Sequence, residues 1–229
     1  MDGVRGQVAG ERLAALLPGA VACEESDEPG DVETLFPEEA ALVARAVDKR
    51  RREFAAVRGC ARRALVHLGH PPVPLLTGDR GAPRWPSGVV GSLTHCSGYA
   101  AAAVAPAQAV LGLGIDAEPH APLPHGVLEA VTSPAERAAV TDLLAARPDV
   151  RWDSLLFSAK ESVYKCWFPL ARRWLGFGDV ALDVDPAGGT FAARLLVPGP
   201  TVAGRELTRF DGRWAVSSGL VLTAIALPH

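Results

Sequence analysis

The sequence predicts an α+β protein in which antiparallel strands pack against helices, and three observations lead to this class. Apolar residues recur at helical spacing in three segments, 37–68, 132–146 and 152–167. Segments with the composition of strands lie at 89–95, 99–105, 109–115, 180–184, 190–197, 207–216 and 220–227. Helices followed by strands thus occur twice, which favours two related halves with a junction near 120–130.

A short echo points to the same two halves. Residues 97–99 (Ser-Gly-Tyr) open a strand of small apolar residues that ends near Pro106. Residues 218–220 (Ser-Gly-Leu) open a similar strand that ends at Pro228. A chance similarity would explain this echo equally well.

The ends of the first predicted helix are well marked. Pro37 suits the first helical position, and Glu38 and Glu39 favour the positive end of the helix dipole. Gly69, followed by a His-Pro-Pro run, ends it. About 30 residues is long for a single globular helix, so the pattern leaves room for a break inside it.

Similar signals bound the other segments. The run Ser-Pro-Ala-Glu at 133–136 begins the second helix, and Pro169 ends the third. Asp211-Gly212 predicts a turn within the segment 207–216. The acidic stretch 23–31 and the Pro- and Gly-rich stretch 71–91 are expected to be loops.

The composition is that of a globular protein. The 229 residues are 48% hydrophobic and 21% charged, which excludes global disorder. The net charge is −3, so bulk attraction to nucleic acid or to an anionic membrane is not expected. Any anion site must therefore be local.

The cysteines and the N-terminus favour a cytoplasmic protein. The four cysteines include no C-x-x-C pair, which fits a reducing compartment. Charged residues interrupt any apolar signal sequence, at Asp2, Arg5, Glu11 and Arg12. The apolar run 99–115 contains proline and glycine and is interpreted as two strands around a turn, not as a membrane span.

The first motif that could carry chemistry is GIDAEP, at 114–119. Asp116 and Glu118 lie two residues apart in an extended segment, so both carboxylates point to the same face. Such carboxylates repel each other unless a cation lies between them, and Mg²⁺ takes oxygen ligands and bridges to phosphate. The alternative is a polar strand end that leads into a solvated turn.

The second motif is FSAKESVYK, at 157–165. On a helix, Glu161 and Lys165 share a face and Lys160 lies beside them, which would complete a site for a metal and a phosphate. The alternative is structural, because Ser158 and Glu161 fit a capping box and Glu161 and Lys165 fit an ordinary surface pair.

The third motif is a basic helical stretch, and guanidinium groups bind phosphates bidentately. Its cations are Lys49, Arg50, Arg51, Arg52, Arg58, Arg62 and Arg63. A solvated charged face is the first alternative. A nucleic-acid-binding helix is the second, although only Phe54 interleaves with the cations.

The fourth motif is GSLTHCSGY, at 91–99. His95 follows a strand that also carries the hydroxyl groups of Ser92 and Thr94. This histidine could transfer a proton, donate to a phosphate or simply be packed. The sequence contains no G-x-S-x-G, no Walker loop and no H-E-x-x-H.

In this order the motifs resemble those of the 4′-phosphopantetheinyl transferases. The resemblance runs over residues 35–229 and includes the GDRGAPRWP loop at 78–86. It is strongest to the group that activates siderophore, peptide and polyketide carrier proteins, and particularly to its actinobacterial members. The pair G-I-D-x-E and F-x-x-K-E-S-x-x-K, some 40 residues apart, is the specific signature.

The resemblance implies two α+β halves related by a pseudo-two-fold axis, with coenzyme A in the cleft between them. It implies three parts of the chain: an N-terminal extension of unassigned role at 1–34, an N-terminal half at 35–125 and a C-terminal half at 126–229. It also implies Mg²⁺, or Mn²⁺, as the metal.

The resemblance also assigns residues. The metal would be held by Asp116, Glu118, Glu161 and the backbone of Ala117. Coenzyme A would be contacted by Arg50, Arg58, Thr77, Gly78, Asp79, Arg80, Thr94, His95, Lys160 and Lys165. Many relatives carry lysine in place of Thr77, which leaves its charge contribution open, and Arg80 could compensate.

The implied reaction is attack of a carrier serine on the β-phosphate of coenzyme A, with 3′,5′-ADP as leaving group. Glu161, directly or through water, would be the general base, with His95 as the competing choice, and Lys165 would stabilise developing charge. The implied partners are apo acyl, peptidyl or polyketide carrier domains, with no nucleic acid and no membrane, and the protein is expected to be a cytoplasmic monomer. Arg172 and Arg173 could steer the acidic carrier.

Other functions remain open at this point. A coenzyme A-binding regulator without turnover would share the binding residues but not the chemistry. A nucleic-acid-binding protein would show strongly salt-dependent binding and give no role to the three carboxylates. A different Mg²⁺-dependent phosphotransferase would need a triphosphate-binding glycine-rich loop, which the sequence lacks.

Overall fold

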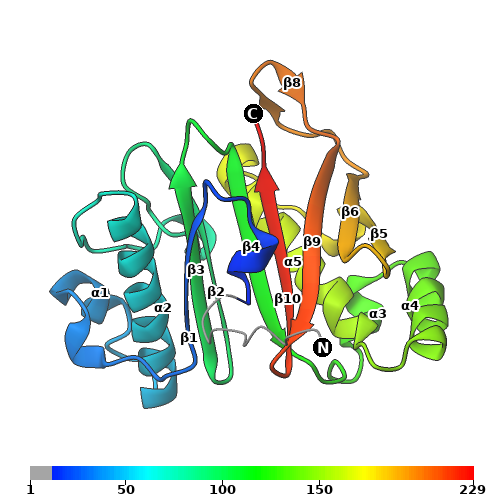
Figure 1. Cartoon of the computed structure of the whole chain (residues 1–229), viewed down its shortest axis with the longest axis horizontal. Coiled ribbons are helices and arrows are strands. Elements are labelled where there is room, and N and C mark those ends of the chain that lie inside the picture. The colour runs from blue at the N-terminus through cyan, green and yellow to red at the C-terminus, as the bar shows by residue number, and fades with distance from the viewer. Residues whose placement is uncertain (1–11) are drawn as a thin grey trace, which may run out of the picture.

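The computed structural model describes residues 12–229 of the chain, and Asp2, Arg5 and Glu11 lie outside them. Two sheets stand side by side, each covered by a long helix (Figure 1). The helices are α1 Pro37–Leu42, α2 Asp48–His67, α3 Val127–Val131, α4 Pro134–Ala146 and α5 Trp152–Ala171. Short 3₁₀ turns lie at Ala14–Leu16, Val32–Thr34, Asp79–Gly81 and Phe177–Asp179. The α+β class expected from the sequence is confirmed.

The first sheet has three antiparallel strands in the order β1-β3-β2. These are β1 Ala22–Ser26, β2 Val89–Cys96 and β3 Tyr99–Pro106. Helix α2 packs on this sheet through small side chains, because alanines on β3 face Cys60, Ala61 and Ala64 of the helix. The predicted long helix is indeed broken, since α1 ends at Leu42 and α2 begins at Asp48.

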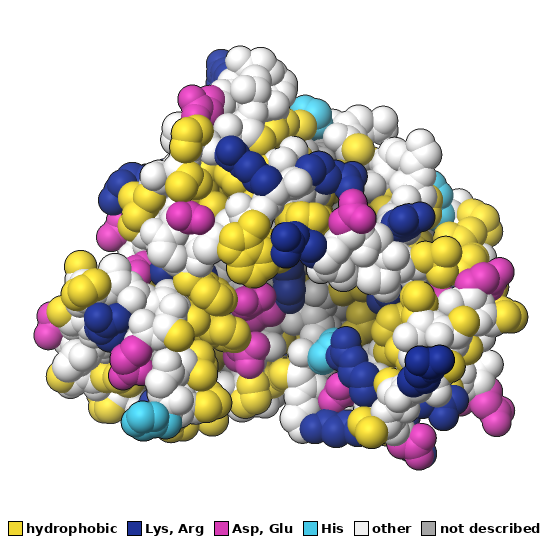
Figure 2. Space-filling model, turned by 180° about the vertical axis from the view of Figure 1, so that it is seen from behind, with side chains coloured by type: hydrophobic (Ala, Val, Ile, Leu, Met, Phe, Trp, Pro, Cys, Tyr) yellow, Lys and Arg dark blue, Asp and Glu magenta, His cyan; other side chains and the backbone are white. Residues whose placement is uncertain are grey.

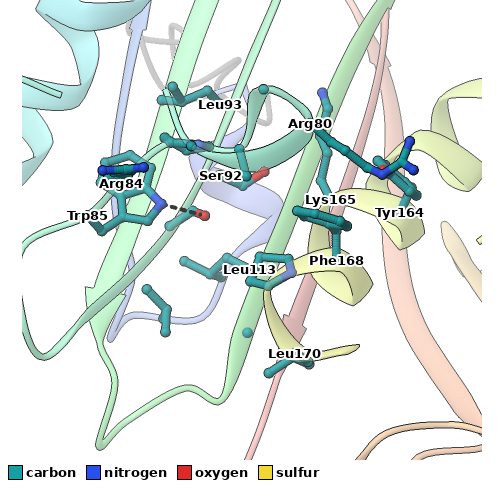
Figure 3. Close-up of a pocket in the computed structure, with 18 of the residues that line it drawn as sticks. Arg80, Arg84, Trp85, Ser92, Leu93, Leu113, Tyr164, Lys165, Phe168 and Leu170 are labelled. Carbon is teal, nitrogen blue, oxygen red and sulfur yellow. Dashed lines mark hydrogen bonds between the residues drawn. The ribbon is translucent and has the colours of Figure 1, made fainter. Parts of the chain in front are cut away.

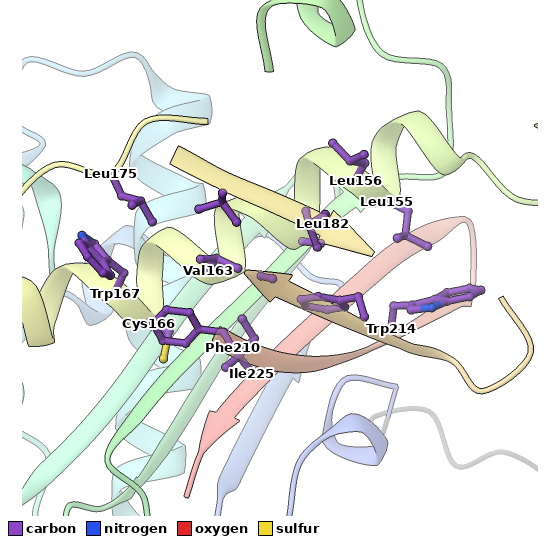
Figure 4. Packing of buried hydrophobic residues seen from close by; sticks show 14 of the residues in the cluster. Leu155, Leu156, Val163, Cys166, Trp167, Leu175, Leu182, Phe210, Trp214 and Ile225 are labelled. Carbon is purple, nitrogen blue, oxygen red and sulfur yellow. The ribbon is translucent and has the colours of Figure 1, made fainter. Parts of the chain in front are cut away.

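The second sheet has five antiparallel strands in the order β4-β10-β9-β6-β5. These are β4 Gly112–Pro119, β5 Val180–Asp185, β6 Thr190–Leu195, β9 Arg209–Ser217 and β10 Leu220–Leu227, and a separate pair is formed by β7 Thr201–Val202 and β8 Arg205–Glu206. Helix α5 covers this sheet. The largest core cluster lies between them, around the buried side chains of Trp167 and Phe210 (Figure 4).

The two sheets meet along β2 and β4 without a backbone ladder between them. Instead, the hydroxyl of Ser92 accepts a hydrogen bond from the amide of Ile115 at 3.0 Å, and the hydroxyl of Thr94 accepts one from Ala117 at 3.1 Å. The residue numbers of the partners increase together on the two strands, so β2 and β4 run in the same direction. We call this junction the hydroxyl seam.

The echo in the sequence marks two similar hairpin turns. Ser97-Gly98 joins β2 to β3, and Ser218-Gly219 joins β9 to β10. Gly98 has φ 76° and Gly219 has φ 75°, a left-handed conformation that glycine adopts without strain.

Three local predictions are wrong. Asp211-Gly212 is not a turn but lies inside β9, because the ring of Phe191 packs where a Cβ of Gly212 would lie. Pro169 does not end α5, which continues to Ala171, since a proline near the end of a helix removes only one hydrogen bond. The third is the strand expected at 109–115, which begins only at Gly112.

The acidic stretch 23–31 is also not purely a loop. Its first residues form β1, which pairs with β3. Glu24 binds Arg63 at 2.9 Å and His67 at 2.8 Å, and Glu25 accepts from the hydroxyl of Tyr99 at 2.8 Å. Residues 22–26 of the N-terminal extension are therefore part of the first sheet, and the guanidinium of Arg63 compensates the charge of Glu24 there.

Within residues 12–229, none of the helices combines the length and the apolar character needed to cross a membrane.

Candidate active site

A cavity of about 820 Å³ lies between the two sheets. One wall is the loop 78–85 together with β2, and the other is the face of α5 that carries Glu161, Tyr164 and Lys165 (Figure 3). Figure 2, which views the molecule from behind relative to Figure 1, shows the hollow with basic side chains along its rim. We call this space the central cavity.

The carboxyl end of β4 brings Asp116 next to the cavity wall. Asp116 is buried, and its Oδ1 accepts from Lys165 Nζ at 2.7 Å and from the Thr94 hydroxyl at 3.3 Å. Its Oδ2 is buried and has no hydrogen-bond partner. A buried carboxylate oxygen without a partner is costly, and it is suited to receive a cation.

The three predicted carboxylates influence one another electrostatically. Burial raises the pKa of Glu118 to about 7, and the charges of Asp116 and Glu161 contribute to the rise. Burial, followed by the charge of Asp116, also raises the pKa of Glu161. Lys165 opposes both shifts. The site thus concentrates negative charge that one lysine only partly compensates.

The described part of the chain holds no ready-made metal site. Among residues 12–229, no group of three or more His, Cys, Asp or Glu side chains is arranged so that it could hold an ion as it stands. The donor set nevertheless fits a hard divalent cation, since Asp116 has a free buried oxygen and Glu118 and Glu161 are oxygen donors that repel one another.

A glycine allows α5 to approach β4 closely. A Cβ placed on Gly114 would lie 1.9 Å from the carbonyl oxygen of Ser162 in α5. The side chains of Glu161 and Lys165 reach the end of β4 because the two backbones are in contact at this point. Here the glycine of the GIDAEP motif has a packing role.

His95 lies on the other side of β2 from the hydroxyl seam and contacts Arg50 of α2. Burial lowers the pKa of His95, and the charge of Arg50 lowers it further. The imidazole is therefore neutral at pH 7. Because Arg50 donates to Nε2, the remaining proton is on Nδ1.

Arg58 is buried and holds the loop that leads to the cavity. Its Nε donates to the carbonyl of Leu75 at 2.9 Å and its Nη2 to the hydroxyl of Thr77 at 3.5 Å. Burial lowers the pKa of Arg58 to about 10, so the group stays charged at pH 7. The loop then turns at Gly78, Asp79 and Arg80, all of which line the cavity.

Arg80 reaches across the cavity mouth. Its guanidinium lies 5.3 Å from the ring centre of Trp174, which belongs to the second half of the chain. Arg80 has φ 51°, which is uncommon for a residue other than glycine.

Lys160 does not join the other predicted residues. Its ammonium group is buried and donates to the carbonyls of Val131 and Phe177 and to Glu136, at 2.9, 2.9 and 3.0 Å. These bonds use all three protons, so none is left for a phosphate. This corrects the expectation that Lys160 faces the pyrophosphate.

The cavity is also lined by residues for which the sequence analysis predicts no role. Tyr164 and Phe168 follow Glu161 and Lys165 on the cavity-facing side of α5, and Arg84 and Trp85 come from the loop (Figure 3). The helical spacing from Glu161 to Tyr164 was the signal that could have found the tyrosine.

The aromatic and basic residues of the segment 167–174 divide into core and surface. Trp167 and Phe168 are buried and belong to the core. Trp174 is 58% exposed, and Arg172 is exposed and lines the cavity mouth. A basic and aromatic edge thus borders the cavity.

Comparison with protein families matches two adjacent segments of the chain. Residues 38–105 match the 4′-phosphopantetheinyl transferase N-terminal domain, and residues 112–216 match the 4′-phosphopantetheinyl transferase superfamily. The division between the two matches falls between β3 and β4, where the chain passes from the first sheet to the second.

Three curated proteins are similar over nearly the full chain. The 4′-phosphopantetheinyl transferase Svp of Streptomyces mobaraensis is 61% identical over 94% of this chain and 89% of its own length. PptT of Mycobacterium tuberculosis is 52% identical, over 95% of this chain and 99% of its own length. Npt of Nocardia iowensis is 49% identical over 93% of this chain and 99% of its own length. The last two also carry the name 4′-phosphopantetheinyl transferase.

Proposed function

Because this chain belongs to the 4′-phosphopantetheinyl transferase superfamily, we propose that it transfers the phosphopantetheine of coenzyme A to a serine of an apo carrier protein. The observation that carries the proposal is the position of the carboxylates. Glu161 and Lys165 line the cavity of about 820 Å³ between the two sheets. Behind them, Asp116 accepts from Lys165 at 2.7 Å, and Glu118 is close enough for the charges of Asp116, Lys165 and Glu161 to shift its pKa.

In the proposed reaction the serine hydroxyl forms a new bond to the β-phosphorus of coenzyme A. The bond between this phosphorus and the bridging oxygen of the pyrophosphate breaks, and 3′,5′-ADP leaves with the electron pair. The serine proton passes to Glu161, directly or through a water molecule. His95, the competing base, is neutral and could take the proton at Nε2 only if Arg50 moved away.

Asp116, Glu118 and Glu161 would hold a divalent cation, with the free Oδ2 of Asp116 as one donor. Such an ion would neutralise charge on the pyrophosphate of the coenzyme. The role of Lys165 is to stabilise developing negative charge from the same wall. Arg80 and Arg84, which line the cavity, would supply the local positive charge that a protein of net charge −3 needs to bind a polyanion.

The carrier would dock at the edge formed by Arg172 and Trp174. Both lie at or beside the mouth of the central cavity and are open to solvent. An acidic carrier domain matches the positive charge of this edge.

The experiment that tests the proposal is intact-mass spectrometry of an apo carrier domain incubated with the protein, coenzyme A and Mg²⁺. The expected result is a gain of one phosphopantetheine group that disappears with a chelator. No gain on a peptidyl, a polyketide and a fatty-acid carrier, from a folded sample that binds coenzyme A, would refute transfer and favour a binding-only protein.

A further inference from the structure

Each half of the chain contains one buried glutamate in the same local setting. Glu39 is the third residue of α1 and Glu136 the third residue of α4, and each helix begins with a proline. Each carboxylate reaches back to the amide before its helix, Glu39 to Phe36 at 3.1 Å and Glu136 to Ser133 at 2.8 Å. Both glutamates precede a helix of 20 residues, α2 and α5 respectively.

The two glutamates also bind partners of the same kind beyond their own helix. Each accepts from a cation on the long helix that follows, Glu39 from Arg62 at 2.8 Å and Glu136 from Lys160 at 3.0 Å. Each also accepts the amide of a leucine beyond that helix, Leu75 at 2.9 Å or Leu182 at 3.1 Å. The correspondence covers four features, which supports an internal repeat.

In the first half, one of the residues that bind Glu39, Leu75, lies just before the loop 78–85, which forms one wall of the central cavity. Glu39 holds the amide of Leu75, and Arg58 holds the carbonyl of the same residue. Thr77 follows two residues later and begins the loop that lines the cavity. The backbone of Leu75 is thus clamped from both sides immediately before the loop.

In the second half, the cation that binds Glu136 lies on α5, whose face with Glu161 forms the other wall of the central cavity. Lys160 is bound by Glu136 and by two carbonyls, and the next residue of α5 is Glu161. Rotation of α5 about its axis would break these three bonds, so they set the direction in which Glu161 points.

We propose that Glu39 and Glu136 are positioning residues for opposite walls of the cavity. Glu39 positions the coenzyme loop, and Glu136, through Lys160, positions Glu161. Lys160 therefore acts on the protein and not on the phosphates. This inference rests on the proposed function. It assigns roles to two glutamates that the motifs do not contain.

The test uses the full chain with Glu39→Gln and Glu136→Gln, each serving as the matched control for the other. Three quantities are measured for each variant: the Kd for coenzyme A, the Kd for Mg²⁺ and the kcat of transfer. Glu39→Gln is expected to raise the Kd for coenzyme A about tenfold and to leave the Kd for Mg²⁺ within about twofold. Glu136→Gln is expected to weaken Mg²⁺ binding and kcat about tenfold while the Kd for coenzyme A stays within about twofold.

Equal changes in both variants, or changes that follow only the loss in Tm, would overturn the proposal. If either variant fails to fold, Arg62→Lys and Lys160→Arg replace them, because both keep the charge. Arg62→Lys is expected to raise the Kd for coenzyme A, and Lys160→Arg to weaken Mg²⁺ binding and kcat, each by a smaller factor than the glutamate variant. Lys160→Met gives a direct check, because a large rise in the Kd for coenzyme A would mean that Lys160 contacts the phosphates.

The two proposals fail in different ways. A wild-type protein that binds coenzyme A and Mg²⁺ but modifies no carrier refutes the proposed function. The two binding constants still decide whether Glu39 and Glu136 act on separate walls, because neither measurement requires turnover.

Discussion

The ammonium group of Lys165 lies 2.7 Å from Asp116 Oδ1 and 3.0 Å from the carbonyl oxygen of Ile115. One side chain of α5 thereby binds both the backbone and the carboxylate at the end of β4. Its positive charge also lowers the pKa of Glu118 and of Glu161, against the rise that burial causes. Lys165 therefore both holds α5 against the end of β4 and counters the negative charge of the carboxylates.

Replacing Lys165 by methionine is expected to lower kcat about 100-fold, because the charge that faces the reacting phosphate is lost. The pKa of Glu118 should rise above its value of about 7, since the opposing charge is gone. The measurement is carrier modification by intact mass over a pH series. Lys49→Met is the control, because Lys49 is exposed and pairs only with Glu53. A Lys165 variant as active as this control would contradict the assignment.

Replacing Glu161 by alanine is expected to abolish transfer while changing the Kd for coenzyme A by less than about threefold. The reason is that Glu161 is proposed to take the serine proton, whereas the coenzyme is held mainly by the opposite wall. Calorimetry gives the Kd and mass spectrometry the rate. Glu38→Ala, an exposed glutamate, is the control. Retained turnover in Glu161→Ala would exclude it as the base.

The raised pKa of Glu118 makes the metal-free protein less stable as the pH rises. The folded state binds this proton up to about pH 7, whereas the unfolded chain releases it near 4.5. The stabilising contribution is complete below pH 4.5 and is lost as the pH rises through 7. Glu118→Gln is therefore expected to raise Tm at pH 8 by about 2–4 °C and to leave it unchanged near pH 4.5.

The measurement for Glu118→Gln is thermal unfolding in the presence of a chelator at both pH values. The same shift in Tm at pH 4.5 and at pH 8 would show that the effect does not come from ionisation.

Replacing Gly114 by alanine is expected to destabilise the protein by about 1–3 kcal/mol, because the new methyl group would meet the Ser162 carbonyl. Activity should fall further than stability, since α5 carries Glu161 and Lys165. Gly19→Ala is the control, because nothing lies within 4 Å of that position. Unfolding in urea gives the free energy. Equal stability of the two variants would show that α5 does not press on β4.

Much of the fold follows from local pattern. The helix beginning at Pro134 and the hairpin turns at Ser97 and Ser218 could be predicted because their signals lie within a few residues of each other. The turn predicted at Asp211-Gly212 is wrong because the residue that decides the local structure is distant in sequence. The neighbour of Gly212, Phe191, is on another strand, and only the folded sheet brings the two together.

The site shows the same division between local and distant signals. The sequence predicts Asp116, Glu118 and Glu161 as site residues because the two motifs place carboxylates at regular spacing. The burial of Lys160 could not be predicted, since its partners Val131, Glu136 and Phe177 are each distant in sequence. Glu39 was considered only as part of a helix dipole. Its partner amide in Leu75 lies 36 residues away and gives no pattern.

The hydroxyl seam means that the width of the cleft depends on two side chains. Ser92 and Thr94 take the place of a backbone ladder between the sheets. Separating the halves along this junction breaks the bonds of these two hydroxyls, to the amides of Ile115 and Ala117 and to the Asp116 carboxylate, and breaks no ladder. The amide protons of Ile115 and Ala117 therefore report on opening of the cleft. Their exchange with deuterium should be faster than that of amides within the ladder between β4 and β10, and coenzyme bound to both walls should slow it.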